Sequence, residues 1–218
     1  MVYSDSTRIV TLGVVFVINV FNDDTHLMTL LPEFVTAYEC DHILRRSIQN
    51  LQPADVVSDD GKGRKHPGRT GSNTWLPHKT DSIIYGLSNR LANAAQMPLE
   101  NAEDLQIVYY GVGQEYDYHF DSFDKDEDPA YNESYLKGGQ RIMTVFGFLN
   151  DVPKGGETGF KRLGINIQPK RGTVVLWYNT KPGTNKREHL SEHAGLPVLE
   201  GQKYAFNLWF HENRYQEL

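Results

Sequence analysis

Four short segments in the second half of the chain are rich in valine, isoleucine and aromatic residues: 105–110, 140–149, 173–178 and 203–211. Turn-forming sequences such as Lys154-Gly155-Gly156 separate them. Short β-prone runs bounded by glycine, proline and asparagine are typical of strands in an antiparallel sandwich or barrel. The pattern therefore predicts a β core in residues 105–214.

Helical periodicity is confined to the first half. Residues 36–49 place one set of side chains on a single helical face: Ala37, Cys40, Ile43, Leu44 and Ile48. A second helix is predicted from an N-cap at Asp81 to about Gln96, with its apolar face formed by Ile83, Ile84, Leu87 and Leu91 and with Pro98 ending it. Segment 32–104 is thus expected to supply supporting helices.

Residues 53–80, between the two predicted helices, are polar and rich in glycine and proline. A loop of this length in a compact domain is often a lid or a binding loop, so we predict a lid loop here.

An apolar run, Ile9–Phe21, lies near the N-terminus. It is shorter than the roughly 18 residues that a membrane span needs. It also lacks the basic n-region and small-residue cleavage site of a secretory signal, and its valines and isoleucines favour a buried strand. We expect two strands within residues 8–31, joined at Asn22-Asp23-Asp24, and no membrane association.

Composition limits the classes of function. The chain has 218 residues, a formal net charge of −6 and one cysteine, Cys40. This length fits a single domain over residues 1–218, and the negative charge argues against a nucleic-acid partner. One cysteine excludes an intrachain disulfide and predicts a cytoplasmic location, although a secretory route stays open.

Three side chains in the β half form a candidate metal site. In a strand, His119 and Asp121 would point to the same face, and His193 follows later in the chain. Two histidines and one carboxylate are the facial triad of non-haem Fe(II) oxygenases, which leaves open positions on the metal. Lys203, which opens the last long strand, is placed to anchor the far carboxylate of a dicarboxylic acid. A single H-x-D pair is weak evidence, and a core histidine is the alternative for His119 alone.

The sequence around these residues resembles the prolyl 4-hydroxylase catalytic domain over about residues 32–214. The resemblance is carried by Tyr110-Gly-Val-Gly-Gln-Glu-Tyr116-Asp-Tyr-His119-Phe-Asp121, Gln140-Arg141-Ile-Met-Thr144, Leu149-Asn-Asp-Val-Pro-Lys-Gly-Gly-Glu-Thr158, His193-Ala-Gly-Leu-Pro-Val-Leu-Glu-Gly-Gln-Lys203 and Asn207-Leu-Trp209-Phe-His211-Glu. The tail looks most like the collagen-type branch.

This resemblance implies a mainly β fold with flanking helices (α+β), built on a double-stranded β-helix or jelly-roll core. It implies Fe(II), 2-oxoglutarate, O₂ and ascorbate as reductant, with His119, Asp121 and His193 as metal ligands. Four residues match contacts of 2-oxoglutarate: Lys203, Tyr110, Thr158 and Trp209. Lys203 and the three metal ligands together form the expected catalytic set. Three others match positions near the peptide substrate: Tyr116, Arg141 and His211.

The resemblance further implies peptidyl-proline 4-hydroxylation, with a proline-containing peptide or protein as partner. The alternative is the same chemistry on another target, such as free proline or a different protein side chain. A third hypothesis is a non-catalytic binding module that has kept the fold, and the intact set of metal and Lys203 residues argues against it. We expect a free-standing catalytic domain, a monomer or homodimer, without a disulfide isomerase subunit.

Overall fold

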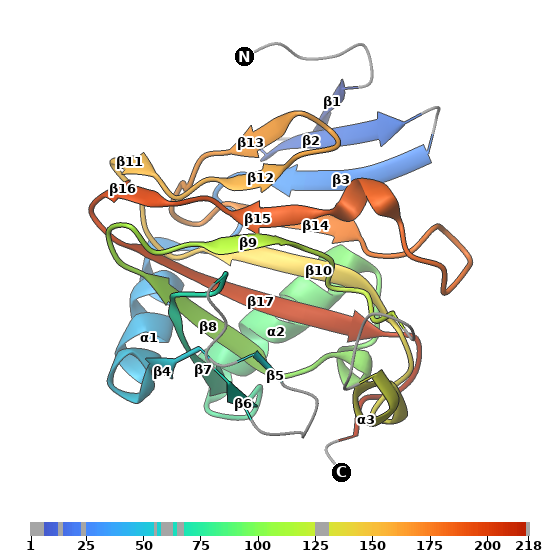
Figure 1. Ribbon diagram of the computed structural model, residues 1–218, viewed down its shortest axis with the longest axis horizontal. Helices are drawn as coiled ribbons and strands as arrows, with labels where there is room; N and C mark the ends of the chain where they lie inside the picture. The colour runs from blue at the N-terminus through green and yellow to red at the C-terminus, as the bar shows by residue number, and fades with distance from the viewer. Residues whose placement is uncertain are drawn as a thin grey trace.

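The computed structural model describes residues 7–12, 15–22, 25–54, 56–57, 63–64, 68–124 and 131–216. Within them, nine strands form one antiparallel sheet, the major sheet (Figure 1), in the order β1-β2-β3-β14-β10-β17-β8-β7-β4. In that order the strands are Thr7–Leu12, Val15–Asn22, Thr25–Leu31, Val174–Tyr178, Arg141–Phe148, Lys203–His211, Leu105–Tyr110, Ser72–Leu76 and Gln52–Pro53.

A smaller sheet faces the major sheet. Its four described strands, in the order β13-β12-β15-β9, are Ile165–Ile167, Thr158–Phe160, His193–Gly195 and Tyr116–His119. Two further pairs are β11 with β16 (Lys154–Gly155 and Val198–Glu200) and β5 with β6 (Val56–Val57 and Gly63–Arg64). Two facing antiparallel sheets confirm the predicted jelly-roll core.

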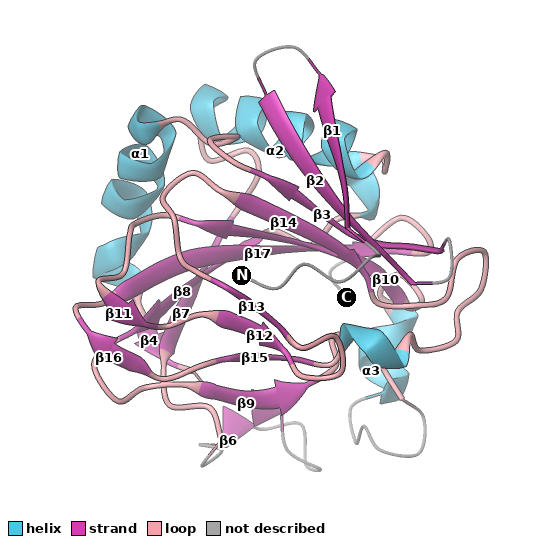
Figure 2. Cartoon of the chain, turned by 90° about the horizontal axis from the view of Figure 1, so that it is seen from above, coloured by secondary structure: helices cyan, strands magenta, loops and turns pink. Residues whose placement is uncertain are grey.

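The described helices are α1 (Ala37–Ser47), α2 (Ser82–Ala95) and the short α3 (Tyr131–Leu136), with 3₁₀ turns η1 (Ile48–Asn50), η2 (Leu99–Asn101) and η3 (His189–Ser191). Figure 2 shows α1 and α2 on the outer face of the major sheet, opposite the smaller sheet. This arrangement confirms that helices of the first half support the β core.

Side chains of the central strands alternate between two buried layers. On β17, Phe206 and Leu208 pack toward the helices, whereas Ala205 packs between the two sheets. On β10, Val145 and Phe146 divide in the same way. Because both faces of the major sheet are covered, its central strands are apolar at nearly every position, which is why they were visible in the sequence.

All four β-rich segments predicted in the second half are strands, namely β8, β10, β14 and β17. Two strands were predicted within residues 8–31, and this was wrong, because the structure has three there: β1, β2 and β3. The chain reverses direction between Leu12 and Val15 and again after Asn22. Gly13 interrupts the apolar run Ile9–Phe21 in the sequence, and residues 13–14 lie outside the described residues. No helix among the described residues has the length and apolar character needed to cross a bilayer.

The predicted loop 53–80 was also partly wrong, because Ser72–Leu76 forms β7 beside β8 in the major sheet. Its sequence, Ser-Asn-Thr-Trp-Leu, lacks the apolar alternation of a half-buried strand, because only the last residue is buried. Residues 55, 58–62 and 65–67 of this segment lie outside the described residues, and its role as a lid stays a prediction. The turn expected at Lys154-Gly155-Gly156 instead contains the short strand β11.

Both predicted helices are present. Thr36 caps α1 through a capping box with Glu39, and Cys40 and Ile43 are buried as expected. The predicted apolar face was wrong at its ends, because Ala37 is exposed and Ile48 lies in η1, 44% exposed. At these two positions the helix has turned away from the sheet.

The N-cap of α2 gives a test of local stability. The Asp81 carboxylate accepts hydrogen bonds from the Ile83 and Ile84 amides and contacts His42 and Arg46. Burial works to raise the pKa of Asp81, but these donors outweigh burial and hold it well below its usual range. Asp81→Ala should lower the free energy of unfolding by about 1 kcal/mol at pH 7, measured by urea denaturation.

The Asp81→Asn variant is the matched control, because it keeps the capping oxygen and loses only the charge. Since the folded-state pKa is lowered, the carboxylate stabilises the protein above the ordinary pKa near 4, and this contribution is lost as the pH falls. Equal stability of Asp81→Ala and the unsubstituted protein at pH 7 would contradict the capping role.

Candidate metal and co-substrate site

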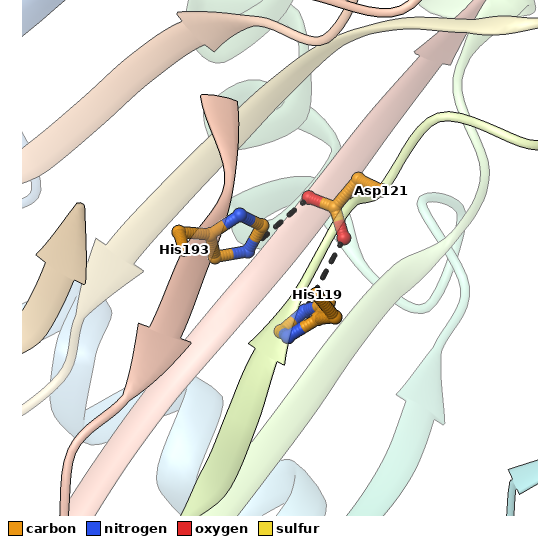
Figure 3. Close-up of side chains that lie close together, drawn as sticks. All are labelled: His119, Asp121 and His193. Carbon is orange, nitrogen blue, oxygen red and sulfur yellow. Dashed lines mark ion pairs between the residues drawn. The ribbon is translucent and has the colours of Figure 1, made fainter. Parts of the chain in front are cut away.

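His119, Asp121 and His193 converge on one point between the two sheets (Figure 3). His119 ends β9, and His193 begins the neighbouring strand β15, where the two histidines are register partners. The Nε2 atoms of His119 and His193 lie 3.7 and 3.6 Å from the two carboxylate oxygens of Asp121. These distances are too long for hydrogen bonds, and the potential ligand atoms all lie within 4.8 Å of one another, which is the spacing that a shared metal ion requires.

Asp121 reaches this point although β9 ends at His119, so the predicted continuous strand through Asp121 was wrong. Arg187 holds the turn after the strand in place. Its guanidinium lies 4.4 Å from the centre of the Phe120 ring and donates to the Ser122 carbonyl at 3.2 Å. The residues on either side of Asp121 are therefore both fixed by one arginine.

Both histidines are oriented by their own backbone. Nδ1 of His119 lies 2.8 Å from the Asp117 carbonyl, and Nδ1 of His193 lies 2.9 Å from the Ser191 carbonyl. A carbonyl only accepts, so each Nδ1 carries the proton and each Nε2 presents a lone pair toward Asp121. This is the tautomer that a metal-ligating histidine needs.

A buried hydrogen-bond chain holds Asp121 from behind. The Thr144 hydroxyl donates to Oδ2 of Asp121 at 2.7 Å and accepts from Nδ2 of Asn179 at 2.8 Å. Thr144 and Asn179 are both fully buried. The carboxylate is thus fixed in direction before any ion arrives.

The electrostatics of the cluster favour the metal-binding protonation states. Burial, together with the neighbouring His193, lowers the pKa of His119 to about 3. Burial alone would raise the pKa of Asp121, but the two imidazoles and the Thr144 hydroxyl outweigh it and lower that pKa. A neutral His119 and an ionised Asp121 are the forms that bind a divalent cation.

Aromatic rings enclose the metal site. The Tyr116 ring is stacked on His119, with 3.7 Å between centroids, and the Arg69 guanidinium lies 4.8 Å from the centre of the same ring. Trp177 packs edge-on against His193 at 4.8 Å. The sequence expectation placed Tyr116 near the substrate, and the structure places it against the metal ligand and in the wall of the cavity described next.

A cavity of about 550 Å³ opens from the triad along the inner face of the major sheet. Lys203 lines it at the start of β17 and is only 1% exposed. Among the described residues its ammonium has no hydrogen-bond or ion-pair partner, although it lies between 5.4 and 5.8 Å from the centres of three aromatic rings. Burial lowers the pKa of Lys203 to about 7, even though Glu157 acts in the opposite direction.

Two polar groups accompany Lys203 in this wall. The Thr158 hydroxyl is buried and has no hydrogen-bond partner among the described residues. Tyr110 is the register partner of Lys203, and burial raises the pKa of its phenol to about 12, so it stays a neutral donor. A buried cation and two hydroxyls without an anionic partner are suited to receive a carboxylate.

Trp209 also lines the cavity, but it lies six residues along β17 from Lys203, about 20 Å at the usual strand rise. Its register partner is Thr144, so it flanks the metal end of the cavity and not the lysine end. Its indole nitrogen is buried without a hydrogen-bond partner among the described residues.

Arg141 and His211 share one buried partner that sequence reasoning missed, Glu103. Arg141 donates to both carboxylate oxygens of Glu103, at 2.5 and 2.9 Å, and Nε2 of His211 lies 2.8 Å from the same group. The Arg141 guanidinium also stacks on Trp209 at 4.1 Å and lines the cavity, whereas His211 is buried behind it. A substrate contact for either residue stays a prediction.

Other members of the site were also missed. Arg69 lies in the segment 53–80 that was predicted only as a lid loop, and Thr144 was quoted only as part of a motif. Asn179 and Glu103 carry no local signal, since each acts through a partner more than thirty residues away in the chain.

Comparison with known proteins agrees with this geometry. The profile of the 2OG-Fe(II) oxygenase superfamily matches residues 105–211. Prolyl 4-hydroxylase 2 of Arabidopsis thaliana is 33% identical over 207 residues, covering 85% of this chain and 67% of the plant protein. Prolyl 4-hydroxylase subunit alpha-1 of Gallus gallus is 37% identical over 144 residues, covering 66% of this chain and 27% of that subunit.

A solved structure is also similar. The viral collagen prolyl hydroxylase of Paramecium Bursaria Chlorella virus-1, in complex with 2OG, superposes with a TM-score of 0.67 at 28% identity, covering 84% of this chain and 94% of that one. The fold and the His-Asp-His site define an Fe(II) and 2-oxoglutarate dependent oxygenase. Within that class, the chain belongs to the prolyl 4-hydroxylase family.

The residues present fit both groups that this family uses. The donor set of two imidazoles and one carboxylate suits Fe(II). The Thr158 hydroxyl and the Lys203 ammonium, neither of which has a hydrogen-bond partner among the described residues, suit the distal carboxylate of 2-oxoglutarate. The site therefore has residues suited to bind the metal that a keto acid chelates and residues suited to bind the distal carboxylate of the same molecule.

The hydrogen bond behind Asp121 can be tested directly. Thr144→Val keeps the shape of the side chain and removes the hydroxyl that fixes the carboxylate, so affinity for Mn²⁺ or Fe(II) should fall by about 10- to 100-fold. Isothermal titration under anaerobic conditions measures the change. Thr144→Ser, which keeps the hydroxyl, should bind close to normally, and unchanged affinity of Thr144→Val would contradict the orienting role.

The lowered pKa of Lys203 predicts a pH dependence for 2-oxoglutarate binding. Above about pH 7 the free site holds a neutral amine, and binding a carboxylate then requires proton uptake. The dissociation constant of the Mn²⁺-loaded protein should rise toward tenfold per pH unit between pH 7.5 and 9, measured by calorimetry. Tyr110, with a pKa of about 12, does not titrate in this window.

The Lys203→Ala variant is the control for this slope. It should bind 2-oxoglutarate weakly at every pH, with metal affinity nearly retained. A wild-type dissociation constant that is flat from pH 7.5 to 9 would show that another group supplies the positive charge.

Proposed function

We propose that this chain hydroxylates proline residues of a peptide or protein at C4, coupled to conversion of 2-oxoglutarate and O₂ to succinate and CO₂. One observation carries the proposal: the His-Asp-His triad and the buried Lys203 line the same open cavity. The relatives and the viral structure named above support prolyl 4-hydroxylation over other reactions of the superfamily.

The chain's own residues have separate tasks. His119, Asp121 and His193 would hold Fe(II), and Lys203 with Thr158 and Tyr110 would fix 2-oxoglutarate. When bound, iron and 2-oxoglutarate supply the oxidising power that inserts one atom of O₂ into a C–H bond.

The remaining wall of the cavity is left for the peptide. Arg141 and Trp209 lie beside the triad on the inner face of β10 and β17, and Glu103 fixes the guanidinium. The rings of Tyr116, Phe160 and Trp177 pack against the histidines and limit access of water to them. Both features favour positioning of substrate over solvent.

The reaction is tested with purified protein, Fe(II), ascorbate and 2-oxoglutarate. A proline-rich peptide should stimulate succinate formation and gain one oxygen per turnover, measured by mass spectrometry, with the new hydroxyl at C4. His119→Ala should reduce peptide hydroxylation to background, because only two ligands remain.

Ile83→Ala, a substitution in α2 away from the cavity, serves as a control for general damage to the protein. Succinate release that no proline peptide changes would direct the search to free proline or another side chain. Metal binding without any turnover would support a binding module.

A further inference from the structure

Lys203 is a buried amine as well as a candidate cation. Its nitrogen lies 5.8, 5.4 and 5.5 Å from the centres of the Tyr110, Phe146 and Phe148 rings. No carboxylate among the described residues forms an ion pair with it, and the side chain is 1% exposed. Such surroundings favour the neutral amine over the ammonium, and the pKa of Lys203 is lowered to about 7. The free site therefore presents a nitrogen lone pair to the cavity, and a neutral amine is a nucleophile.

Hydrogen-bond donors suited to an anion line the same part of the cavity. The Thr158 hydroxyl is buried and has no hydrogen-bond partner among the described residues. The Tyr110 phenol stays neutral because burial raises its pKa to about 12, and the charge of Arg69 lies near enough to act on it. All of these groups line one cavity with Lys203. An anion formed on the lysine nitrogen would thus find two hydroxyl donors and a nearby cation.

CO₂ is the electrophile that fits this amine. It is small and apolar, so it enters a cavity lined by aromatic rings, and conversion of 2-oxoglutarate to succinate releases it there. The lysine nitrogen donates its lone pair to the carbon of CO₂, and an N–C bond forms. One C–O bonding pair moves onto oxygen, and the proton on nitrogen passes to water. The product is a carbamate anion, and the step consumes no oxidant, reductant or further reactant.

We propose that Lys203 is a carbamylation site, at which CO₂ adds to the free amine and the resulting carbamate excludes 2-oxoglutarate. The carbamate oxygens accept from Thr158 and Tyr110, the same hydroxyls that suit the distal carboxylate of the co-substrate. Carbamylation also removes the positive charge that this carboxylate needs. The exclusion rests on the proposed function, in which Lys203 holds 2-oxoglutarate, and it adds control of that site by the CO₂ concentration.

Burial makes the modification selective. Among the lysines in the described ranges of the chain, only Lys203 is buried. A solvated lysine stays protonated at neutral pH and has no lone pair for CO₂. Exposed lysines such as Lys154, Lys161 and Lys170 are therefore expected to stay unmodified, and each serves as an internal reference.

Carbon-13 NMR tests the modification without turnover. Zn²⁺-loaded protein under ¹³C-enriched CO₂ should show a carbamate resonance that is separate from those of CO₂ and bicarbonate, and excess 2-oxoglutarate should remove it. Alkylation with a trimethyloxonium salt converts a carbamate to a stable methyl ester. Digestion and mass spectrometry should then locate this ester at Lys203.

Two variants control the assignment. Lys203→Arg keeps a cation in the cavity but should give no carbamate resonance, because a guanidinium stays protonated. Lys170→Ala removes an exposed lysine that does not line the cavity, and it should give the wild-type resonance.

Exclusion of the co-substrate is measured by calorimetry on the same Zn²⁺-loaded protein. At the CO₂ concentration that half-saturates the carbamate resonance, the apparent dissociation constant of 2-oxoglutarate should double, because the two ligands compete for one state of Lys203. In Lys203→Arg this constant should not respond to CO₂. In stopped-flow mixing, dissolved CO₂ should slow 2-oxoglutarate binding directly, whereas bicarbonate at equal ionic strength should do so only with carbonic anhydrase present. Equal action of bicarbonate alone would show ionic competition and overturn the proposal.

The remaining outcomes separate the modification from the reaction. Absence of a carbamate resonance in the wild type, or an equal resonance in Lys203→Arg, would overturn carbamylation and leave the proposed function standing. A carbamate on Lys203 that leaves the dissociation constant of 2-oxoglutarate unchanged would overturn the exclusion. If the carbamate forms but the wild type hydroxylates no proline peptide even at low CO₂, the proposed function fails and the modification stands.

Discussion

The pairing of β9 with β15 is the constraint on which the site depends. Their register places His119 opposite His193, so two ligands come together through backbone hydrogen bonds and not through flexible side chains. A shift of β15 by one residue would turn the His193 imidazole to the other face of the small sheet, away from His119. The register is in turn held by packing, since Phe160 and Trp177 contact His193 from the layer between the sheets. The metal site is therefore a consequence of the jelly-roll core.

The opposite end of the cavity is governed by charge. A buried ammonium without a partner among the described residues is unfavourable, and its lowered pKa shows that the protein tolerates Lys203 in part by favouring its neutral form. A dicarboxylate co-substrate relieves this strain by supplying the missing charge. The apolar surroundings are the cause: the rings of Phe146 and Phe148 lie 5.4 and 5.5 Å from the Lys203 ammonium. The attraction between the Lys203 ammonium and a carboxylate therefore contributes to binding of the co-substrate and not to the stability of the free protein.

Much of this could be predicted from the sequence, and the failures have physical causes. The central strands were identifiable because burial on both faces makes them rich in apolar and aromatic residues. His119, Asp121, His193 and Lys203 were identifiable because they occur in motifs with characteristic spacing. β7 was missed since an edge region with one buried residue resembles a loop. Glu103 was missed because its function is set by Arg141 and His211, which only the fold brings to it.

The two sheets divide recognition from chemistry. The two histidine ligands come from the small sheet, and Asp121 follows directly after one of its strands, whereas the floor that faces them belongs to the major sheet. Residues on that floor can change without disturbing the ligand geometry, because each points into the cavity from a strand whose other face is packed against the helices. The outer strands β7 and β4 are the least constrained, since few side chains there are buried. Differences in substrate preference among related enzymes should therefore accumulate at this edge, while the ligand set and the buried lysine are held by the core.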